Sequence, residues 1–399
     1  TIELELIPER LAFLDSNPAA EIYVLGSAII EGVRYDGVGI RYKGSIGAFV
    51  FCTDSPNPLD PTGPKSCPKL SMKVKFNEFA PGQRFYGVKR LQFHAMNFDP
   101  GMMVERMGYS LFREMGVAAS RTAYVRLVIN GAVEGIFLLV EQVDGQFVRS
   151  RFSEGGEGNL YKEAWPITSN PDYYLGSLRT NRDEDPTADK IVAFYEALQS
   201  DASEAVVDWL NIDYMMRYFA VDRAINNDDG AMHFYCGLFG PDGCANHNYF
   251  WYEEVARDRL WLVPWDLDNA AFGAAFNLVA FPGDWRDDDP SCVPEPGPIP
   301  FLPPAVNPAC DPMIHALGDY SGLYQERQQE LLDGPFAQER VEQKIDAWIE
   351  LLRDEVIAAH EANPLLIDAA AWEATAESFK ASLTAARQGL AEDIAAHPE

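Results

Sequence analysis

Residues 106–144, RMGYSLFREMGVAASRTAYVRLVINGAVEGIFLLVEQVD, contain the pattern that decides the fold. At the start of this stretch and just before it, apolar side chains recur every four residues: Met103, Met107, Leu111 and Met115. This spacing predicts an amphipathic helix that ends at Gly116. The next two apolar runs flank an Asn-Gly pair at 130–131, which is typical of a β-hairpin with a two-residue turn. A helix followed by a hairpin predicts an α+β fold.

Strand patterns precede this stretch, and mostly helical patterns follow it. Residues 19–76 alternate as strands do, and in residues 70–76 (LSMKVKF) one face is apolar and the other cationic. Farther along, HNYFWYEE (247–254) and DRLWLVPWDLD (258–268) form a predicted strand pair. Helices are predicted at residues 188–202, 206–226, 341–352 and 372–390.

Size and charge restrict the classes of function. The chain has 399 residues, of which 47% are apolar, and its formal charge is −29. It is therefore expected to be globular, with one large or two medium domains. A field of this sign repels phosphate backbones and anionic lipids, so nucleic-acid binding and attachment to a membrane surface are not expected. No apolar run is long enough for a transmembrane segment, and the start at Thr1 suggests that a leader or upstream segment was removed.

Basic residues gather in one part of this acidic chain. Residues 31–90 hold ten basic and five acidic side chains, whereas residues 91–399 hold 21 and 51. The basic members are Arg34, Arg41, Lys43, Lys65, Lys69, Lys73, Lys75, Arg84, Lys89 and Arg90. This group is either a site that receives an anion or an ordinary solvated face of a sheet.

The six cysteines fall into sequential pairs separated by loops rich in Pro, Gly, Asp and Asn. The predicted disulfides are Cys52–Cys67, Cys236–Cys244 and Cys292–Cys310. Six cysteines allow fifteen connectivities, and free buried thiols are the alternative. Because disulfides persist in oxidising compartments, the pattern predicts a secreted, periplasmic or surface protein. No Cys/His spacing indicates a zinc site.

Polar clusters with apolar flanks mark the candidate sites. They are Lys73 with Lys75, NNDDG (226–230) with His247 and Asn248, and VPWDLDN (263–269). Ionised carboxylates beside aromatic residues need a partner or a metal ion, because desolvating them alone costs several kcal/mol. Asp and Asn oxygens suit Mg²⁺ or Mn²⁺, and with a lysine for phosphate and a free Asp as base they would complete phosphoryl transfer. The sequence motifs of P-loop enzymes and conventional kinases are absent.

Several segments, in this order, resemble the CotH family. They are RYKGS (41–45), KLSMKVKF (69–76), FDP (98–100), residues 106–144 quoted above, GNLYK (158–162), NNDDG (226–230), HNYFWYEE (247–254) and WLVPWDLDNAAFG (261–273). The resemblance covers roughly residues 20–280. It implies an atypical protein-kinase-like fold with a strand-rich amino-terminal lobe, residues 1–144, and a mainly helical carboxyl-terminal lobe, residues 145–399. The second lobe would hold the catalytic and metal segments, 222–273, and a disulfide-closed loop, 283–312.

The resemblance also implies an activity: transfer of the γ-phosphoryl of ATP to Ser or Thr of secreted or coat proteins. In the amino-terminal lobe, Lys73, with Lys75 second, would orient the ATP phosphates. Glu105 would pair with the lysine, and Arg41 and Glu141 would lie near the nucleotide.

In the carboxyl-terminal lobe, Asp229 would be the catalytic base. Asp228 competes for this role because it stands where relatives often carry an aromatic residue. Asn248 and Asp266 would ligate Mg²⁺ or Mn²⁺, with Asp268 as a second carboxylate ligand. The insertion between Asp229 and Asn248, which holds Cys236 and Cys244, leaves the shape of the catalytic loop open.

Other interpretations remain open at this stage. The chain is alternatively a catalytically weak, nucleotide-binding pseudokinase, a structural coat or surface protein of the same fold, or an enzyme that transfers AMP. His94, His233 and His247 are expected to be structural. The acidic runs at 183–186 and 287–290 are expected to be solvated loops, with structural Ca²⁺ as the alternative.

Overall fold

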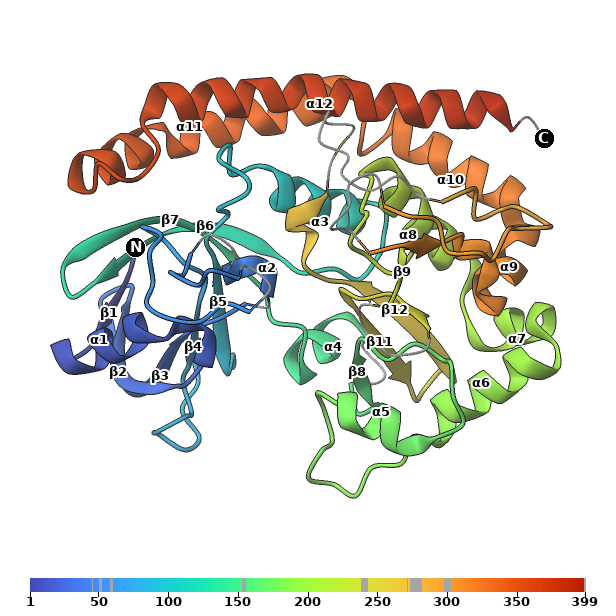
Figure 1. The fold of residues 1–399 in the computed structure, drawn as a ribbon, viewed down its shortest axis with the longest axis horizontal. Coiled ribbons are helices and arrows are strands. Elements are labelled where there is room, and N and C mark those ends of the chain that lie inside the picture. Colours follow the sequence, from blue (N-terminus) through green and yellow to red (C-terminus); the bar gives the residue numbers. More distant parts are fainter. Residues whose placement is uncertain are drawn as a thin grey trace. The chain divides into compact units, whose positions relative to one another are not determined.

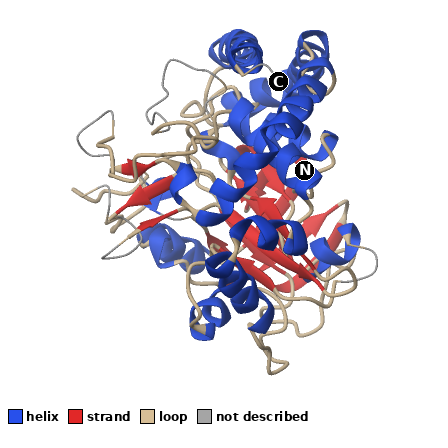
Figure 2. Cartoon of the chain, turned by 90° about the vertical axis from the view of Figure 1, so that its right-hand side faces the viewer, coloured by secondary structure: helices blue, strands red, loops and turns tan. Residues whose placement is uncertain are grey.

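The computed structural model describes residues 1–44, 46–49, 52–57, 60–152, 156–237, 243–270, 272, 282–297 and 303–397. Helices and strands are both abundant (Figure 2), so the α+β class predicted from the sequence is confirmed. The chain forms two compact units. Unit 1 comprises Thr1–Arg106, Arg121–Gln142 and Lys344–Phe379, and unit 2 comprises Met107–Ser120, Val143–Gln343 and Lys380–Glu399. The lobes 1–144 and 145–399 stay a prediction, because each compact unit combines segments from both.

Unit 1 is built on a closed barrel (Figure 1), in which the strand order is β1-β2-β3-β4-β5-β7-β6. The pairs are antiparallel except β1 with β6, which is parallel. The strands are β1 (Ile2–Glu5), β2 (Val24–Ile30), β3 (Val33–Tyr42), β4 (Met72–Lys75), β5 (Arg90–His94), β6 (Thr122–Ile129) and β7 (Ala132–Val140). Leu4, Val74 and Phe93 are completely buried in the barrel core. In β4 this leaves Lys73 and Lys75 on the opposite face, as the alternation predicts.

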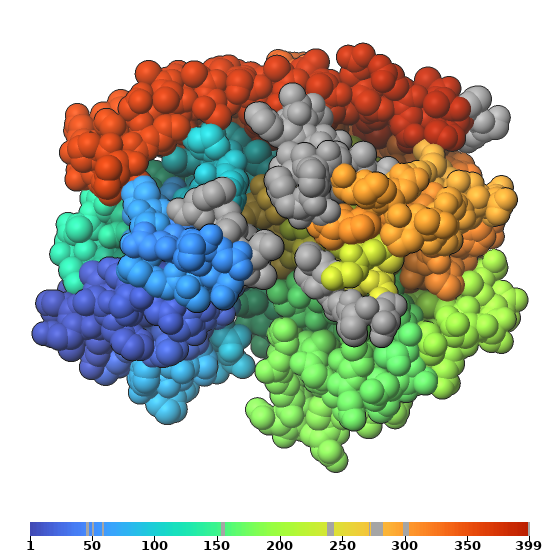
Figure 3. Space-filling model, in the orientation of Figure 1, coloured from blue at the N-terminus to red at the C-terminus, as the bar shows by residue number. Residues whose placement is uncertain are grey.

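Short helices accompany the barrel in unit 1. They are α1 (Pro8–Ser16), η1 (Pro18–Ala20) and α2 (Ile46–Phe49). Leu14 is the buried side chain of α1, and the rest of this helix contributes to the dark-blue surface in Figure 3. Unit 1 also contains the second part of α11 (Gln338–Ala362) and the first part of α12 (Ala369–Ala396). These long helices confirm the two amphipathic segments predicted near the carboxyl terminus.

The helix and hairpin of residues 106–144 form as predicted. Helix α3 (Val104–Glu114) ends before Gly116, whose φ of +79° places it in the left-handed region that favours glycine. Asn130 and Gly131 join β6 to β7 with φ values of +51° and +81°. Two successive residues with positive φ make the turn whose twist matches that of the flanking strands.

Unit 2 combines two small sheets with helices. One sheet has the order β12-β11-β8 and the other β10-β9-β13. The strands are β8 (Leu160–Lys162), β9 (Phe234–Cys236), β10 (Cys244–Ala245), β11 (Tyr249–Glu254), β12 (Arg259–Pro264) and β13 (Ala305–Val306). The helices are α4 (Gly145–Arg151), α5 (Pro171–Ser177), α6 (Asp189–Ser200), α7 (Ala202–Trp209), α8 (Ile212–Ala224), η2 (Leu267–Asn269), η3 (Pro308–Cys310), α9 (Pro312–Leu317), η4 (Gly318–Tyr320) and α10 (Ser321–Asp333).

Helix α6 confirms the helix predicted at residues 188–202, whereas the helix predicted at 206–226 is divided into α7, which begins at Ala202, and α8. Asp201 begins α7 by accepting a hydrogen bond from the Glu204 amide at 3.1 Å. Asn211 begins α8 in the same way, with the Tyr214 amide at 3.0 Å. Apolar periodicity does not register the break between α7 and α8, because a capping Asn interrupts a helix without changing the pattern of its buried face.

All six cysteines are described, and they form the predicted disulfides Cys52–Cys67, Cys236–Cys244 and Cys292–Cys310. Residues 298–302 of the Pro-rich loop lie outside the described residues, as does most of the apolar stretch 270–282 and part of the motifs 41–45 and 261–273. Within the described part of the chain, no helix combines the length and apolar character that a membrane crossing requires.

Candidate functional site

The β11–β12 hairpin in unit 2 brings Asn248 and Asp266 to the same end of two paired strands. Tyr249 pairs with Pro264 at the end of the ladder, and the Trp265 amide donates to the Asn248 carbonyl at 3.0 Å. Asn248 and Asp266 have φ values of +59° and +55°, which turn the chain away from the strands. Asn and Asp tolerate this left-handed conformation better than most residues. Both residues therefore lie at the same end of the β11–β12 strand pair.

Hydrogen bonds hold the Asp229 carboxylate at the same end of this strand pair. One carboxylate oxygen lies 2.6 Å from His247 Nε2, and the other accepts from Asn248 Nδ2 and Asn269 Nδ2, each at 2.9 Å. Asn248 Nδ2 also donates to the Asp229 carbonyl at 2.9 Å. We call Asp228, Asp229, His247, Asn248, Asp266 and Asn269 the acidic centre.

The loop that carries Asp229 is fixed by the end of α8. The completely buried Asp222 accepts hydrogen bonds from Arg223 at 2.6 Å and from Asn227 Nδ2 at 2.9 Å. Gly230 packs directly on this group, because a Cβ at that position would lie 2.2 Å from Asn227 Nδ2. The NNDDG motif is thus a compact turn in which a buried carboxylate holds the backbone on one side of Asp229 and glycine permits the close approach.

Charges in the acidic centre influence one another strongly. Burial, and then the negative charge of Asp229, raise the pKa of Asp228 to about 7. Burial alone would lower the pKa of His247, but its hydrogen bond to Asp229 and the charges of Asp229, Glu163 and Asp266 raise it overall. Burial and nearby positive charge lower the pKa of His233 to about 3. Of the histidines His233 and His247, His247 is therefore the one that is suited to carry a proton.

The donor set of the acidic centre fits a hard divalent cation. Among the described residues, no hydrogen bond reaches the Asp266 carboxylate or Asn248 Oδ1. The Asp266 amide donates to the buried Tyr109 hydroxyl at 3.0 Å, which fixes the backbone beneath the carboxylate. Asp268, in η2, is half-buried two residues farther along. Carboxylate and amide oxygens are the ligands that Mg²⁺ and Mn²⁺ prefer.

Unit 1 presents a separate group of cations, which we call the basic face: Arg41, Lys43, Lys73, Lys75 and Arg90. Arg41 pairs with Lys73 across β3 and β4, and Lys75 pairs with Arg90 across β4 and β5. Burial, and then the positive charges of Lys43, Arg41 and Arg90, lower the pKa of Lys73 to about 7, although the charge of Glu21 opposes this change. Among the described residues, no hydrogen bond or ion pair reaches the Lys73 ammonium group. Lys73 is therefore suited to receive an anion.

Arg41 and Lys75, in the same basic face, have carboxylate partners nearby. Arg41 forms an ion pair with Glu21, and Lys75 forms one with Glu78. Both cations also lie against the Tyr23 ring, at 5.1 and 5.7 Å from its centroid.

Glu105 connects to the basic face through a histidine. Its carboxylate lies 2.9 Å from His94 Nδ1, and His94 Nε2 lies 2.5 Å from Lys43 Nζ. An imidazole that accepts from an ammonium at Nε2 must carry its proton on Nδ1, so His94 donates to Glu105. Glu141, at the end of β7, binds Arg121 with a closest distance of 2.7 Å.

The predicted site residues thus fall into two groups. Asp228, Asp229, Asn248 and Asp266 share the acidic centre of unit 2, with Asp268 close in sequence. Arg41, Lys73, Lys75, Glu105 and Glu141 belong to unit 1. No individual role for Lys43 or Asn269 follows from the sequence, and the role expected for His94 and His247 is structural. For His247 a signal existed, since it precedes Asn248 in the same motif.

Comparisons with known proteins point to one family. A family profile described as "CotH kinase protein" matches residues 40–384. "Inner spore coat protein H" of Bacillus subtilis (strain 168) is 22% identical over 198 residues, which are 46% of this chain and 50% of that protein. The chain therefore spans about half the length of this curated relative.

A chain in the solved Shewanella oneidensis MR-1 complex of the toxin–antitoxin system HipA, HipB and its operator DNA is also similar. It is 12% identical with a TM-score of 0.36, over 78% of this chain and 62% of that one. The match over residues 40–384 includes both the basic face and the acidic centre, and by it the chain belongs to the CotH kinase protein family.

Proposed function

We propose that the protein is a secreted or surface protein kinase that transfers the γ-phosphoryl of ATP to Ser or Thr of coat or extracellular proteins. The observation that carries this proposal is the convergence of Asp229, Asn248 and Asp266 at one end of the β11–β12 hairpin. These are the residue types that phosphoryl transfer needs for a base and for divalent cations. Family membership and the spore-coat relative support the choice of reaction and setting.

In this reaction the acidic centre has two tasks. Asn248 Oδ1 and the Asp266 carboxylate would hold Mg²⁺ or Mn²⁺, with Asp268 as a further ligand, and the ion would neutralise charge on the phosphates. Asp229 would accept the proton of the acceptor hydroxyl. The hydroxyl oxygen would then bond to the γ-phosphorus while the bond between the γ-phosphorus and the oxygen that bridges it to the β-phosphate breaks. The hydrogen bonds from His247, Asn248 and Asn269 would orient the Asp229 carboxylate.

In unit 1, the basic face would bind phosphate oxygens. Lys73 has no hydrogen-bonding partner among the described residues, so a polyphosphate would supply the negative charge that this buried amine lacks. Lys75 and Arg41 would add positive charge, and Glu105 would hold Lys43 through His94. Glu141 would fix Arg121 near the nucleotide.

The test compares labelled ATP with Mg²⁺ or Mn²⁺ in the wild type and in Asp266→Ala, using γ-label and α-label in parallel. Transfer of γ-label to the protein or to a Ser-rich acceptor, lost in Asp266→Ala, is expected. Asp258→Ala is the matched control, because this exposed carboxylate lies at the other end of the same hairpin and pairs with Lys190.

Other outcomes identify the alternatives. Transfer of α-label would replace phosphoryl transfer by AMP transfer. Nucleotide-dependent thermal stabilisation without transfer of either label would indicate a pseudokinase. An unchanged rate in Asp266→Ala would refute the role assigned to the acidic centre.

A further inference from the structure

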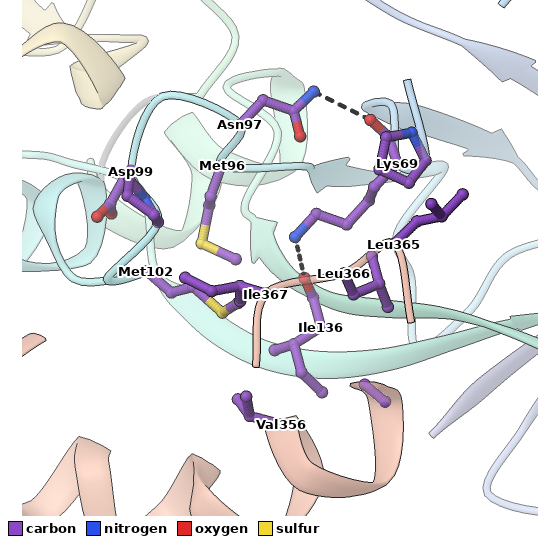
Figure 4. A pocket seen from close by; sticks show the side chains of 13 residues that line it. Lys69, Met96, Asn97, Asp99, Met102, Ile136, Val356, Leu365, Leu366 and Ile367 are labelled. Atoms are coloured by element: carbon purple, nitrogen blue, oxygen red, sulfur yellow. Dashed lines mark hydrogen bonds between the residues drawn. The ribbon is translucent and has the colours of Figure 1, made fainter. Parts of the chain in front are cut away.

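A cavity of about 160 Å³ lies in unit 1, beside the residues that precede α3 (Figure 4). Most of its wall is apolar: Met96, Met102, Ile136, Val356, Leu366 and Ile367. An engineered cavity of roughly this volume, lined by aliphatic and aromatic side chains, holds one benzene molecule. None of the lining residues belongs to the basic face or the acidic centre. The space therefore suits a separate apolar group of about six carbon atoms.

Lys69 introduces one positive charge into this apolar wall. The residue is only 7% exposed, and its Nζ donates to the Ile136 carbonyl at 2.8 Å (Figure 4). The Phe137 ring centroid lies 5.2 Å from the same nitrogen. An ammonium group has three N–H donors, and among the described residues this carbonyl is its single hydrogen-bond acceptor. Two buried donors are thus available to a ligand.

Asp99 also lines the cavity, but its carboxylate caps the amino-terminal end of α3. Its carboxylate accepts a hydrogen bond from the Val104 amide at 2.8 Å, at the amino-terminal end of that helix. Anionic groups are stabilised there by the unsatisfied amides and the helix dipole. Burial lowers the pKa of Lys69 to about 8, and Asp99 partly opposes this change, so the ammonium is the main form at pH 7.

The position of Lys69 is fixed before any ligand arrives. Asn97 Nδ2 donates to the Lys69 carbonyl at 2.9 Å, and the Cys52–Cys67 disulfide holds the chain two residues earlier. Gly135, with a φ of +122°, lets β7 pass close by, because a Cβ there would lie 3.4 Å from Lys69 Cδ and 3.2 Å from Leu366 Cδ1. A preformed site loses little conformational freedom on binding.

We propose that this cavity binds a small monocarboxylate with an apolar body of about six carbon atoms. The carboxylate accepts the two free hydrogen bonds of Lys69, and the apolar body lies among Met102, Ile136 and Leu366. The proposal is independent of phosphoryl transfer, since it uses none of the residues assigned to that reaction.

The experiment measures binding of hexanoate to the full chain at pH 7 by calorimetry and by the shift in Tm, with hexanol and hexylamine as matched ligands. The wild type is expected to bind one hexanoate saturably and to bind hexanol at least tenfold more weakly. Hexylamine is expected not to bind. Lys69→Met, which keeps the length of the side chain and removes its charge, should weaken hexanoate binding at least tenfold.

Two further variants separate binding from folding. Ala359→Leu should abolish binding with Lys69 intact, because Ala359 lines the cavity and the larger side chain fills it. Lys65→Met should bind as the wild type does, because Lys65 does not line the cavity. Absence of saturable binding to the folded wild type, or equal binding by Lys69→Met or Ala359→Leu, would overturn the proposal. Equal affinity for hexanol would overturn the role of the Lys69 charge.

Discussion

Lys73 provides a direct test of the basic face, because anion binding there must be coupled to a proton. With a pKa of about 7, Lys73 is almost entirely neutral at pH 8.5. A polyphosphate that contacts the amine favours the ammonium and returns its pKa toward the ordinary value of roughly 10.5. Binding of ATP at pH 8.5 should therefore take up about one proton per molecule. For the same reason, affinity should fall by about tenfold per pH unit between pH 8 and 9.5.

The assay is calorimetric titration of ATP at fixed Mg²⁺ in buffers of different ionisation enthalpy, whose slope gives the number of protons taken up. Lys73→Met should lose this uptake, and the difference from the wild type removes the contribution of ATP itself. Lys75→Met is the matched control, since it removes a charge from the same strand and leaves Lys73 in place. Measurable ATP binding with the same proton uptake in Lys73→Met would refute the reasoning.

Three further predictions concern unit 2. Asp229→Asn should reduce phosphoryl transfer by about 100-fold or more through loss of the base, whereas Asp228→Asn should cost less than about tenfold; the reverse order in single-turnover assays would exchange their roles. Gly230→Ala should lower the free energy of unfolding by about 1–3 kcal/mol, because its Cβ meets the Asn227 amide. Gly389→Ala, in open space within α12, should raise it by roughly 0.5–1 kcal/mol; urea unfolding measures both, and equal effects would contradict the packing argument. Burial raises the pKa of Asp311 to about 6, so the folded state holds this proton more tightly than the unfolded state. Stability should fall by up to about 3 kcal/mol as pH rises from 4 to 6, and this contribution should be missing from the pH dependence of Asp311→Asn.

Much of the fold follows from local sequence patterns. The α3 spacing, the Asn-Gly turn and the paired cysteines each involve residues within about twenty positions, so local sequence is enough to predict them. The division of the helix predicted at residues 206–226 into α7 and α8 does not follow from this periodicity, although Asn211 is a residue type that commonly begins helices.

The candidate site could be predicted only in part, because motifs identify residues and not their partners. Asp229, Asn248 and Asp266 stand out as polar residues beside apolar strands. Asn269 lies in one of the predicted clusters, but its contact with Asp229 does not follow from the sequence, since it depends on how η2 follows β12. The path from Glu105 through His94 to Lys43 links a helix, a strand and a strand end, and residues 51 positions apart meet in it. Such pairings depend on strand register.

The order of the disulfides along the sequence affects how they can form. Their partners are separated by 15, 8 and 18 residues, and each pair closes before the next one begins along the sequence. In the proposed secreted protein, oxidation of each new cysteine with the one that emerged just before it during export would yield the native set. Bonds formed in order of emergence would thus need no later reshuffling by an isomerase, whereas the fully reduced chain would have fifteen pairings to choose from.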